Sequence, residues 1–334
     1  MPKALITGSA GFIGYHLAQD LLAHGYEVIG LDAMTDYYDV RLKERRQAML
    51  LQSPAFCAIN KRIEEDGVLH DLIAAERPDV IVHLAAQAGV RYSIEAPRSY
   101  VESNLIGTFN LLEAVRATPS AHLLMASTSS VYGANTDMPY AETDKADTQM
   151  SFYAATKKAN EAMAHSYAHI HALPTTMFRF FTVYGPWGRP DMAPIKFAKG
   201  LYSGTPIDIY NHGAMWRDFT YVEDLVRGIR GLIDAVPGGP DTAVDGDSLS
   251  PAAPYRVVNI GNSDKVRLLD FIEALETSSG KTALRNYMDM QPGDVPATWA
   301  DASLLHRLTG YRPNTPVTEG VARFIAWYEE YYRP

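Results

Sequence analysis

The first 180 residues alternate between short apolar runs and longer amphipathic stretches. We interpret the runs as strands near residues 3–7, 26–32, 55–60, 79–84, 122–127 and 174–180. The stretches predict helices near residues 12–24, 39–51, 66–76, 98–117 and 152–171, and two more near 193–203 and 222–234. Continuously apolar strands, such as 80–84, are typical of a parallel sheet covered on both faces. The pattern therefore predicts an α/β fold with a doubly wound, Rossmann-type parallel sheet.

The alternation weakens after about residue 181, and the Gly- and Pro-rich segment 185–190 predicts a turn-rich boundary. We expect a first domain over residues 1–180 and a smaller C-terminal α/β domain over 181–334. The segments near 214–236 and 255–262, the latter with a strand at 256–260, are expected to return to the first domain. Segment 237–254, rich in Gly, Pro, Asp and Ser, predicts a surface loop.

The composition is that of an ordinary globular protein, with 47% hydrophobic and 21% charged residues in 334. A net charge of -9 argues against a nucleic-acid binder and offers no basic stripe to a membrane. The apolar runs are too short to span a bilayer, and the N-terminus has no signal-peptide pattern. The single cysteine, Cys57, excludes an internal disulfide, fits a reducing cytoplasm and is expected to be a small core residue.

Three glycines, Gly8, Gly11 and Gly14, lie between the first strand and the first helix. Such a loop allows a tight turn and a close approach of backbone to a pyrophosphate, which the free N–H groups at Phe12 and Ile13 can bind. Asp32 ends the second strand 18 residues after Gly14. Its carboxylate would accept hydrogen bonds from an adenosine ribose and repel a 2′-phosphate. The loop therefore predicts NAD rather than NADP.

Tyr153 and Lys157 are four residues apart on a predicted helix, so they face the same way. The hydroxyls of Thr128 and its neighbours follow the strand before them. A tyrosine base at neutral pH needs a pKa lowered by roughly 3 pH units, or about 4 kcal/mol. We expect the Lys157 ammonium and a bound nicotinamide to supply that lowering. The group could then take a proton from an alcohol while its hydride leaves for the nicotinamide.

These features together resemble the extended short-chain dehydrogenase/reductase family, specifically its nucleotide-sugar epimerases. The similarity covers nearly the whole chain and is closest to the UDP-glucuronate 4-epimerases. The matching segments are residues 36–40, 83–93, 127–133, 153–161, 179–192, 217–221 and 291–295.

The resemblance implies that Tyr153 is the base, that Lys157 binds the nicotinamide ribose and that Thr128 assists. It also implies a homodimer that pairs the helices near 98–117 and 152–171. Many relatives carry an acidic residue for the adenine after the third strand, where this chain has Arg62, so backbone or Glu64 must serve. The further implied cofactor contacts are Leu84, Ala85, Ala86, Gln87, Asn104 and Ser127, and the implied UDP-sugar contacts are Arg91, Arg189, Arg217 and Asp294.

The resemblance further implies 4-epimerisation of UDP-glucuronate through a transient 4-keto sugar, with no metal. That intermediate is a β-keto acid, so its carboxylate must be held out of line with the carbonyl. Thr128, Ser129, Ser130 and Thr182 are the candidate hydroxyls. Related dehydratases and decarboxylases carry acidic residues where this chain has the two serines, which argues against both reactions. UDP-glucose or UDP-N-acetylglucosamine 4-epimerisation, UDP-glucuronate decarboxylation and a non-enzymatic NAD sensor stay open as alternatives.

Overall fold

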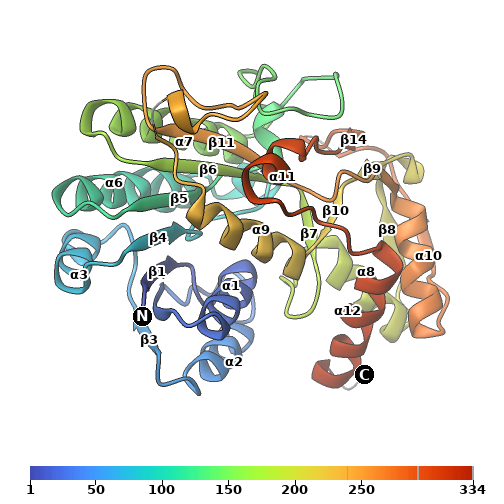
Figure 1. The fold of residues 1–334 in the computed structure, drawn as a ribbon. Helices are drawn as coiled ribbons and strands as arrows, with labels where there is room; N and C mark the ends of the chain where they lie inside the picture. Colours follow the sequence, from blue (N-terminus) through green and yellow to red (C-terminus); the bar gives the residue numbers. More distant parts are fainter. Residues whose placement is uncertain (239, 292, 333–334) are drawn as a thin grey trace.

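The chain is built around one parallel sheet of seven strands (Figure 1). The computed structural model describes residues 1–238, 240–291 and 293–332. The strand order is β11-β6-β5-β4-β1-β2-β3, and the order reverses between β4 and β1, as in a doubly wound sheet. The fold class predicted from the sequence is therefore confirmed. The strands are β1 (Lys3–Thr7), β2 (Glu27–Asp32), β3 (Phe56–Asn60), β4 (Val80–His83), β5 (His122–Ala126), β6 (Thr175–Phe180) and β11 (Tyr255–Ile260).

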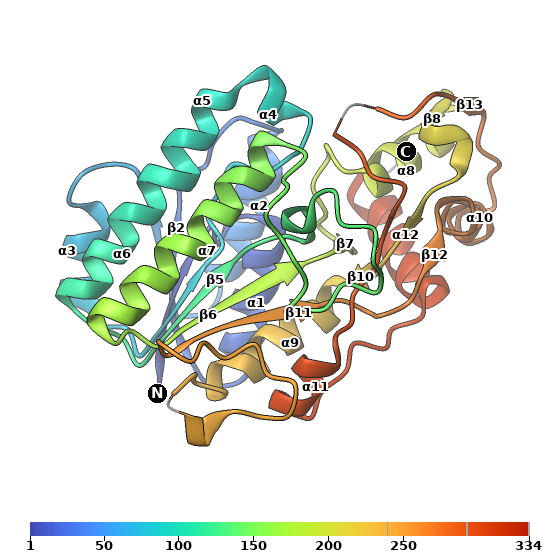
Figure 2. The same cartoon turned by 90° about the horizontal axis from the view of Figure 1, so that it is seen from above.

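Helices cover both faces of the sheet (Figure 2). On one face, Leu17 and Ile229 belong to the same apolar cluster as Ile6 and Val82 of the strands. Alternate strand residues such as Leu5 point into the opposite cluster. The first face carries α1 (Phe12–Ala23), α9 (Val222–Asp234) and α11 (Ser303–Thr309), and the second carries α3 (Val68–Glu76), α6 (Gly107–Ala117) and α7 (Phe152–His171).

The helix predicted near 98–117 is one uninterrupted helical run over 97–117 that contains a π-helical segment. It comprises α5 (Pro97–Tyr100), a π-helical segment (Val101–Ile106) and α6, and it is preceded by the short helix α4 (Tyr92–Glu95). The expectation that Cys57 is a core residue was wrong, because Cys57 is exposed. It lies on β3, the outermost strand of the sheet, where only part of the strand is covered.

The later elements lie beyond the carboxyl ends of β5 and β6 (Figure 2). They share an apolar cluster that includes Tyr184, Phe219, Phe271 and Phe324. Three helices, α10 to α12, have no counterpart in the sequence-based prediction, which placed no helix after residue 234. These elements are β7 (Thr182–Tyr184), α8 (Ala193–Ser203), β8 (Ile207–Ile209), β9 (Trp216–Arg217), β10 (Phe219–Tyr221), β12 (Val266–Arg267), α10 (Leu268–Ser279), β13 (Arg285–Tyr287), β14 (Ala297–Thr298) and α12 (Val317–Tyr332).

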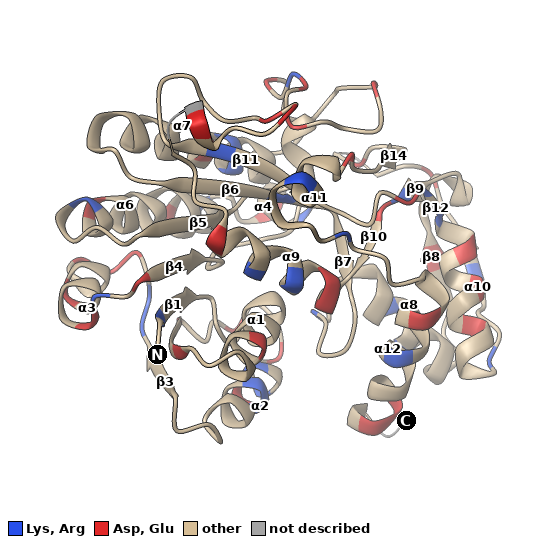
Figure 3. Cartoon of the chain, viewed as in Figure 1, with Lys and Arg blue, Asp and Glu red and all other residues tan. Residues whose placement is uncertain are grey.

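Charged residues are scattered among the elements (Figure 3). Within the described residues, no helix is both long enough and apolar enough to cross a bilayer. The remaining helix of the sheet region, α2 (Val40–Leu50), begins after Asp39, whose side chain accepts a hydrogen bond from the Arg41 backbone N–H.

Candidate active site

Helix α7 carries the predicted tyrosine and lysine on one face. Its first turn is fixed by Ser151, whose hydroxyl accepts a hydrogen bond from the Ala154 N–H at 3.1 Å. The Lys157 side chain is buried and its ammonium donates to the carbonyl oxygen of Ala126, the last residue of β5, at 2.9 Å. This bond ties the middle of the second helical turn to the end of a central strand.

Thr128 lies two residues beyond the end of β5. It caps the short 3-10 helix Ser129–Tyr132, because its hydroxyl accepts from the Ser130 N–H at 3.2 Å. The Thr128 side chain also lies next to the Tyr153 phenol, whose pKa it lowers. The structure thus brings together the three predicted catalytic residues, Thr128, Tyr153 and Lys157.

The electrostatics of Tyr153 depend on its surroundings in the fold. Burial raises the pKa of the phenol, while the neighbouring Thr128 hydroxyl and the charge of Arg189 lower it in part. In the chain without cofactor the shift is set by burial, Thr128 and Arg189, so the expected lowering by Lys157 together with a bound nicotinamide stays a prediction. Burial also lowers the pKa of Lys157 itself, to about 8.

The three loop glycines pack too closely for any other residue. A Cβ on Gly14 would lie 2.1 Å from the Gly8 carbonyl oxygen, and one on Gly11 would lie 2.9 Å from it. Gly8 has a φ of +76° and approaches the backbone of Ala85. Helix α1 starts with no side-chain cap, so its first N–H groups at Phe12, Ile13 and Gly14 remain available to an anion.

Asp32 is buried at the end of β2, beside this loop. Its two carboxylate oxygens accept from the backbone N–H groups of Ala10, at 3.0 Å, and Met34, at 2.8 Å. Each oxygen keeps a second lone pair for a further donor.

The loop after β4 is fixed by Asn104. Its amide oxygen accepts from the Gln87 N–H at 2.8 Å, and its amide nitrogen donates to the Gln87 carbonyl and to Thr156, both at 3.0 Å. Asn104 therefore holds the loop that contains Leu84, Ala85 and Ala86 in place. Its amide oxygen and amide nitrogen both already form hydrogen bonds with protein groups.

Ser127, also expected near the cofactor, donates its hydroxyl to Glu161 at 2.6 Å. Glu161 in turn forms a buried, two-point ion pair with Arg179, with both distances 2.9 Å. At the proposed adenine edge, Arg62 donates to Glu64 at 2.6 Å.

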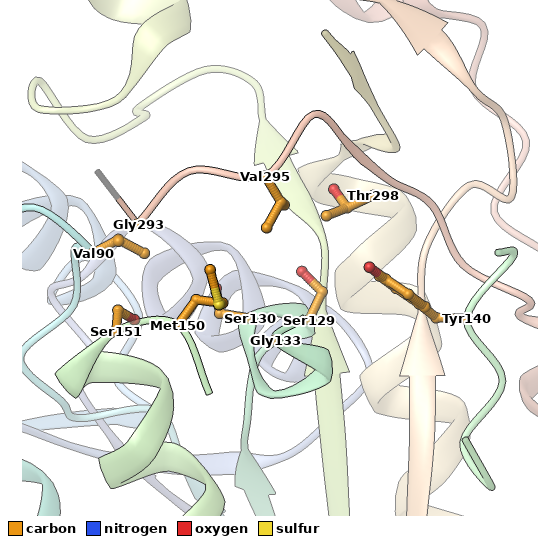
Figure 4. Close-up of a pocket in the computed structure, with 10 residues that line it drawn as sticks. All are labelled: Val90, Ser129, Ser130, Gly133, Tyr140, Met150, Ser151, Gly293, Val295 and Thr298. Atoms are coloured by element: carbon orange, nitrogen blue, oxygen red, sulfur yellow. The ribbon is translucent and has the colours of Figure 1, made fainter. Parts of the chain in front are cut away.

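A pocket opens between the Ser129–Ser130 segment and the chain that precedes β14 (Figure 4). Within the described residues, neither serine hydroxyl has a hydrogen-bond partner. Arg91 donates to Asp294 at 3.0 Å, which joins the loop after β4 to the segment 293–295 at the rim. The lining residues are Val90, Ser129, Ser130, Gly133, Tyr140, Met150, Ser151, Gly293, Val295 and Thr298.

The other predicted substrate arginines are held by protein groups. Arg189 makes a two-point ion pair with Asp191, at 3.1 and 2.5 Å. Arg217 donates to the carbonyl oxygens of Trp216, Val295 and Pro296, and burial lowers its pKa. Thr182 begins β7, where its N–H donates to the Asp218 carbonyl at 3.0 Å.

Comparison with known proteins identifies the chain at the level of family. The model of the NAD dependent epimerase/dehydratase family matches residues 4–261. The chain belongs to this family.

Two relatives of this epimerase/dehydratase are particularly similar. A probable UDP-glucuronate 4-epimerase of Rhizobium meliloti (strain 1021) is 53% identical, over 99% of this chain and 98% of the relative. UDP-glucuronate 4-epimerase 2 of Arabidopsis thaliana is 44% identical, over 99% of this chain and 76% of the relative. The crystal structure of UDP-glucuronic acid 4-epimerase from Bacillus cereus, in complex with UDP-glucuronic acid and NAD, superimposes with a TM-score of 0.88. It is 33% identical and covers 98% of this chain and 99% of its own.

The pocket of this epimerase/dehydratase also contains residues that the sequence did not predict. Tyr140, Met150 and Thr298 come from loops and a two-residue strand, where no periodicity or motif marks them. Val295 lies in a segment that matched the family, but an apolar residue there carries no chemical signal. Asp191 likewise lies in a matching segment, but nothing in the sequence marks it as the partner of Arg189.

Proposed function

We propose that this chain is an NAD-dependent UDP-glucuronate 4-epimerase that interconverts UDP-glucuronate and UDP-galacturonate. The observation that carries the proposal is the convergence of Thr128, Tyr153 and Lys157 beside a glycine cradle, with the free hydroxyls of Ser129 and Ser130 in the adjoining pocket. The relatives from Rhizobium meliloti and Bacillus cereus support the same reaction and substrate.

The residues present fit NAD. Gly8, Gly11 and Gly14 allow the tight backbone turn that leads into α1, and the uncapped N-terminus of α1 suits a pyrophosphate. Asp32 would take the adenosine ribose. When bound, NAD would supply the hydride acceptor and donor for C4 of the sugar.

Tyr153 takes the proton from the sugar 4-hydroxyl and gives it back when the 4-keto sugar is reduced. Because burial raises its pKa, the phenol needs stabilisation as phenolate. Thr128 contributes a neighbouring hydroxyl and Arg189 a positive charge. Lys157, held in place by the Ala126 carbonyl, binds the nicotinamide ribose through its remaining donors.

The hydroxyls around the pocket control the carboxylate. Ser129 and Ser130 line the pocket, and Thr128 and Thr182 are further candidates outside its lining. All are neutral donors, so they can restrain the sugar acid without offering a strong acid to the intermediate. A 4-keto glucuronate loses carbon dioxide when its carboxylate bond aligns with the carbonyl π system. Restraining that bond favours return of the hydride over decarboxylation.

The diphosphate and uridine are bound by side chains that protein groups already hold in place. Arg189 and Arg217 each use only some of their five N–H donors on protein groups, so they keep donors for phosphate oxygens. Arg91 and Asp294 form the rim, with Asp294 binding the uridine ribose.

The same proposal includes the division of the chain. Residues 1–180, with returning segments near 214–236 and 255–262, bind NAD, and the remainder of 181–334 binds the UDP-sugar. The presence of Val222, Leu225 and Ile229 in one cluster with the strands supports the return of the first segment, as the pairing of β11 with β6 supports that of the second.

We also propose a homodimer in the cytoplasm. Ile106, just before α6, Phe109, in the first turn of α6, and Phe152, at the start of α7, are large exposed apolar residues. Their burial against a second copy would remove apolar surface from water. Sedimentation at micromolar concentration should give the mass of a dimer, and an intact monomer would contradict this assembly. A single exposed cysteine fits a reducing compartment.

The deciding experiment is product analysis by NMR with purified, NAD-loaded protein. UDP-glucuronate should yield UDP-galacturonate, whereas UDP-glucose and UDP-N-acetylglucosamine should not be epimerised at a comparable rate. Tyr153→Phe should lose most of the turnover while retaining NAD. Absence of UDP-galacturonate with NAD bound would refute the proposal.

A further inference from the structure

The loop that carries Arg189 is held by side chains from α1 and α2. Three consecutive carbonyl oxygens precede that arginine, and each accepts a hydrogen bond. His16 of α1 contacts the Pro186 oxygen at 2.9 Å, and Arg46 of α2 donates to those of Trp187, at 2.5 Å, and Gly188, at 3.2 Å. Since a carbonyl only accepts, His16 donates; burial lowers its pKa to about 4, so it does so as a neutral ring near pH 7.

The same guanidinium reaches the glycine loop. A second nitrogen of Arg46 donates to the Ala10 carbonyl and to the Tyr38 hydroxyl, both at 2.9 Å. The N–H of Ala10 is the one that donates to Asp32. One side chain therefore joins the cradle proposed for the NAD pyrophosphate to the loop that carries Arg189.

Burial of Arg46 at this place in the fold is energetically unfavourable. Its side chain is 0% exposed, and within the described residues no carboxylate pairs with it. Its Nε is buried without a hydrogen-bond partner. A buried charge satisfied only by neutral oxygens costs free energy of folding. An apolar side chain would fill the space with a smaller loss of folding free energy. We therefore ask which part of the structure the four hydrogen bonds of Arg46 hold in place.

What they fix is a strained loop. Trp187 has a φ of +60°, in the left-handed region that a bulky residue rarely adopts. Such a backbone conformation persists only where surrounding contacts stabilise it. Here the contacts are the hydrogen bonds from Arg46 and the packing of aromatic rings of α12. The Trp187 ring lies 5.5 Å from Trp327 and 5.1 Å from Tyr331.

The orientation of Arg189 follows from this loop. Asp191, two residues after Arg189, accepts hydrogen bonds from the Arg189 guanidinium and from the Tyr37 hydroxyl, the latter at 3.2 Å. The charge of Arg189 also acts on the Tyr153 phenol. Tyr37 and Tyr38, from the segment 36–40 that resembled the family, thus both take part in holding residues 186–191.

We infer that Arg46 is a positioning residue that couples the NAD loop to Arg189, so that NAD and the UDP group bind cooperatively. The inference rests on the proposed function, which assigns the glycine loop to NAD and Arg189 to the diphosphate. Each ligand favours the same arrangement of the two loops. The first to bind therefore pre-orders the loop for the second, and the coupling is reciprocal.

The test measures UDP affinity by calorimetry on the full chain, with and without saturating NAD. In the unmodified protein, NAD should tighten UDP binding about fivefold or more, within the usual range of such couplings. In Arg46→Met the ratio should fall to near one, and in Arg46→Lys to an intermediate value. A wild-type ratio of one, or a wild-type ratio kept in Arg46→Met, would overturn the inference.

Arg256→Met is the matched control, because Arg256 is also fully buried but bonds to Asp247 and the Ala235 carbonyl, away from both loops. It should lose stability and keep the coupling ratio. A second measurement needs no variant: NAD alone should slow backbone hydrogen exchange in residues 186–191 of the unmodified protein, and unchanged exchange there would overturn the inference. UDP binding involves no turnover, so a chain that fails to epimerise but shows the coupling would refute the proposed function alone.

Discussion

Replacing both pocket serines should redirect the reaction rather than stop it. Ser129→Ala/Ser130→Ala removes two hydroxyls that face the pocket and, within the described residues, bond to no protein group. No fold contact is lost with them, so the free energy of unfolding should stay within about 0.5 kcal/mol of the unmodified protein.

The size of the effect follows from the hydrogen bonds removed. If each hydroxyl restrains the sugar carboxylate with a net hydrogen bond of about 1 kcal/mol, the double variant loses about 2 kcal/mol of restraint. At about 1.4 kcal/mol per tenfold, that moves the partition between epimer and decarboxylated pentose roughly 30-fold toward the pentose.

The assay is NMR of the products from UDP-glucuronate labelled at the carboxylate carbon, with released carbon dioxide trapped and counted. Ser151→Ala is the control, because Ser151 lines the same pocket but its hydroxyl caps α7. It should lose about 1 kcal/mol of stability and leave the product ratio unchanged. A double variant whose product ratio stays within about threefold of the unmodified protein would refute the role of these hydroxyls.

Three further predictions concern the framework of the site. Glu161→Gln leaves the Arg179 charge buried without its partner, so urea unfolding at pH 7 should show a loss of about 3–5 kcal/mol; a loss under 1 kcal/mol would contradict the buried pair. Burial raises the pKa of Glu161, but Arg179 and its neighbours lower it by more, so the net shift is downward. The ion pair therefore stabilises the fold above the pKa of an unfolded glutamate, near 4.3, and this stabilisation is lost as the pH falls below that value. Gly14→Ala places a Cβ 2.1 Å from the Gly8 oxygen and should abolish NAD retention, which absorbance of the purified protein checks. Burial lowers the pKa of Lys157 to about 8, against about 10.4 in the unfolded chain, so between these pH values the unfolded chain binds more protons. The free energy of unfolding, relative to that of Lys157→Met, should therefore rise with pH by up to about 1.4 kcal/mol per pH unit. A difference between the two proteins that does not change with pH would contradict the shift.

Local spacing made much of this protein predictable. The strand–glycine–helix order and the four-residue step from Tyr153 to Lys157 depend only on short stretches of chain, and the fold agrees with the predicted order. Ser129 and Ser130 could be selected because they follow a strand end that had to meet the helix of Tyr153.

The partners of these residues were not predictable in the same way. Arg46 and Trp187 are 141 residues apart, and nothing local marks that arginine as buried. The hydrogen bond between Asn104 and the Gln87 backbone and the ion pair between Arg189 and Asp191 both depend on how loops meet after folding. Burial, which raises the pKa of Tyr153, is likewise a property of the assembled chain.

The position of β11 has a consequence for biosynthesis. It pairs in register with β6 from Tyr255↔Thr175 to Ile260↔Phe180, yet residues 181–254 must leave the ribosome between the two. At about 5–20 residues per second, the nascent chain carries β6 as an unpaired edge for roughly 4–15 s. An open strand edge is a template for pairing with another chain. Slow translation of that stretch, or truncation before residue 260, should therefore drive the polypeptide toward aggregates and make it dependent on chaperones.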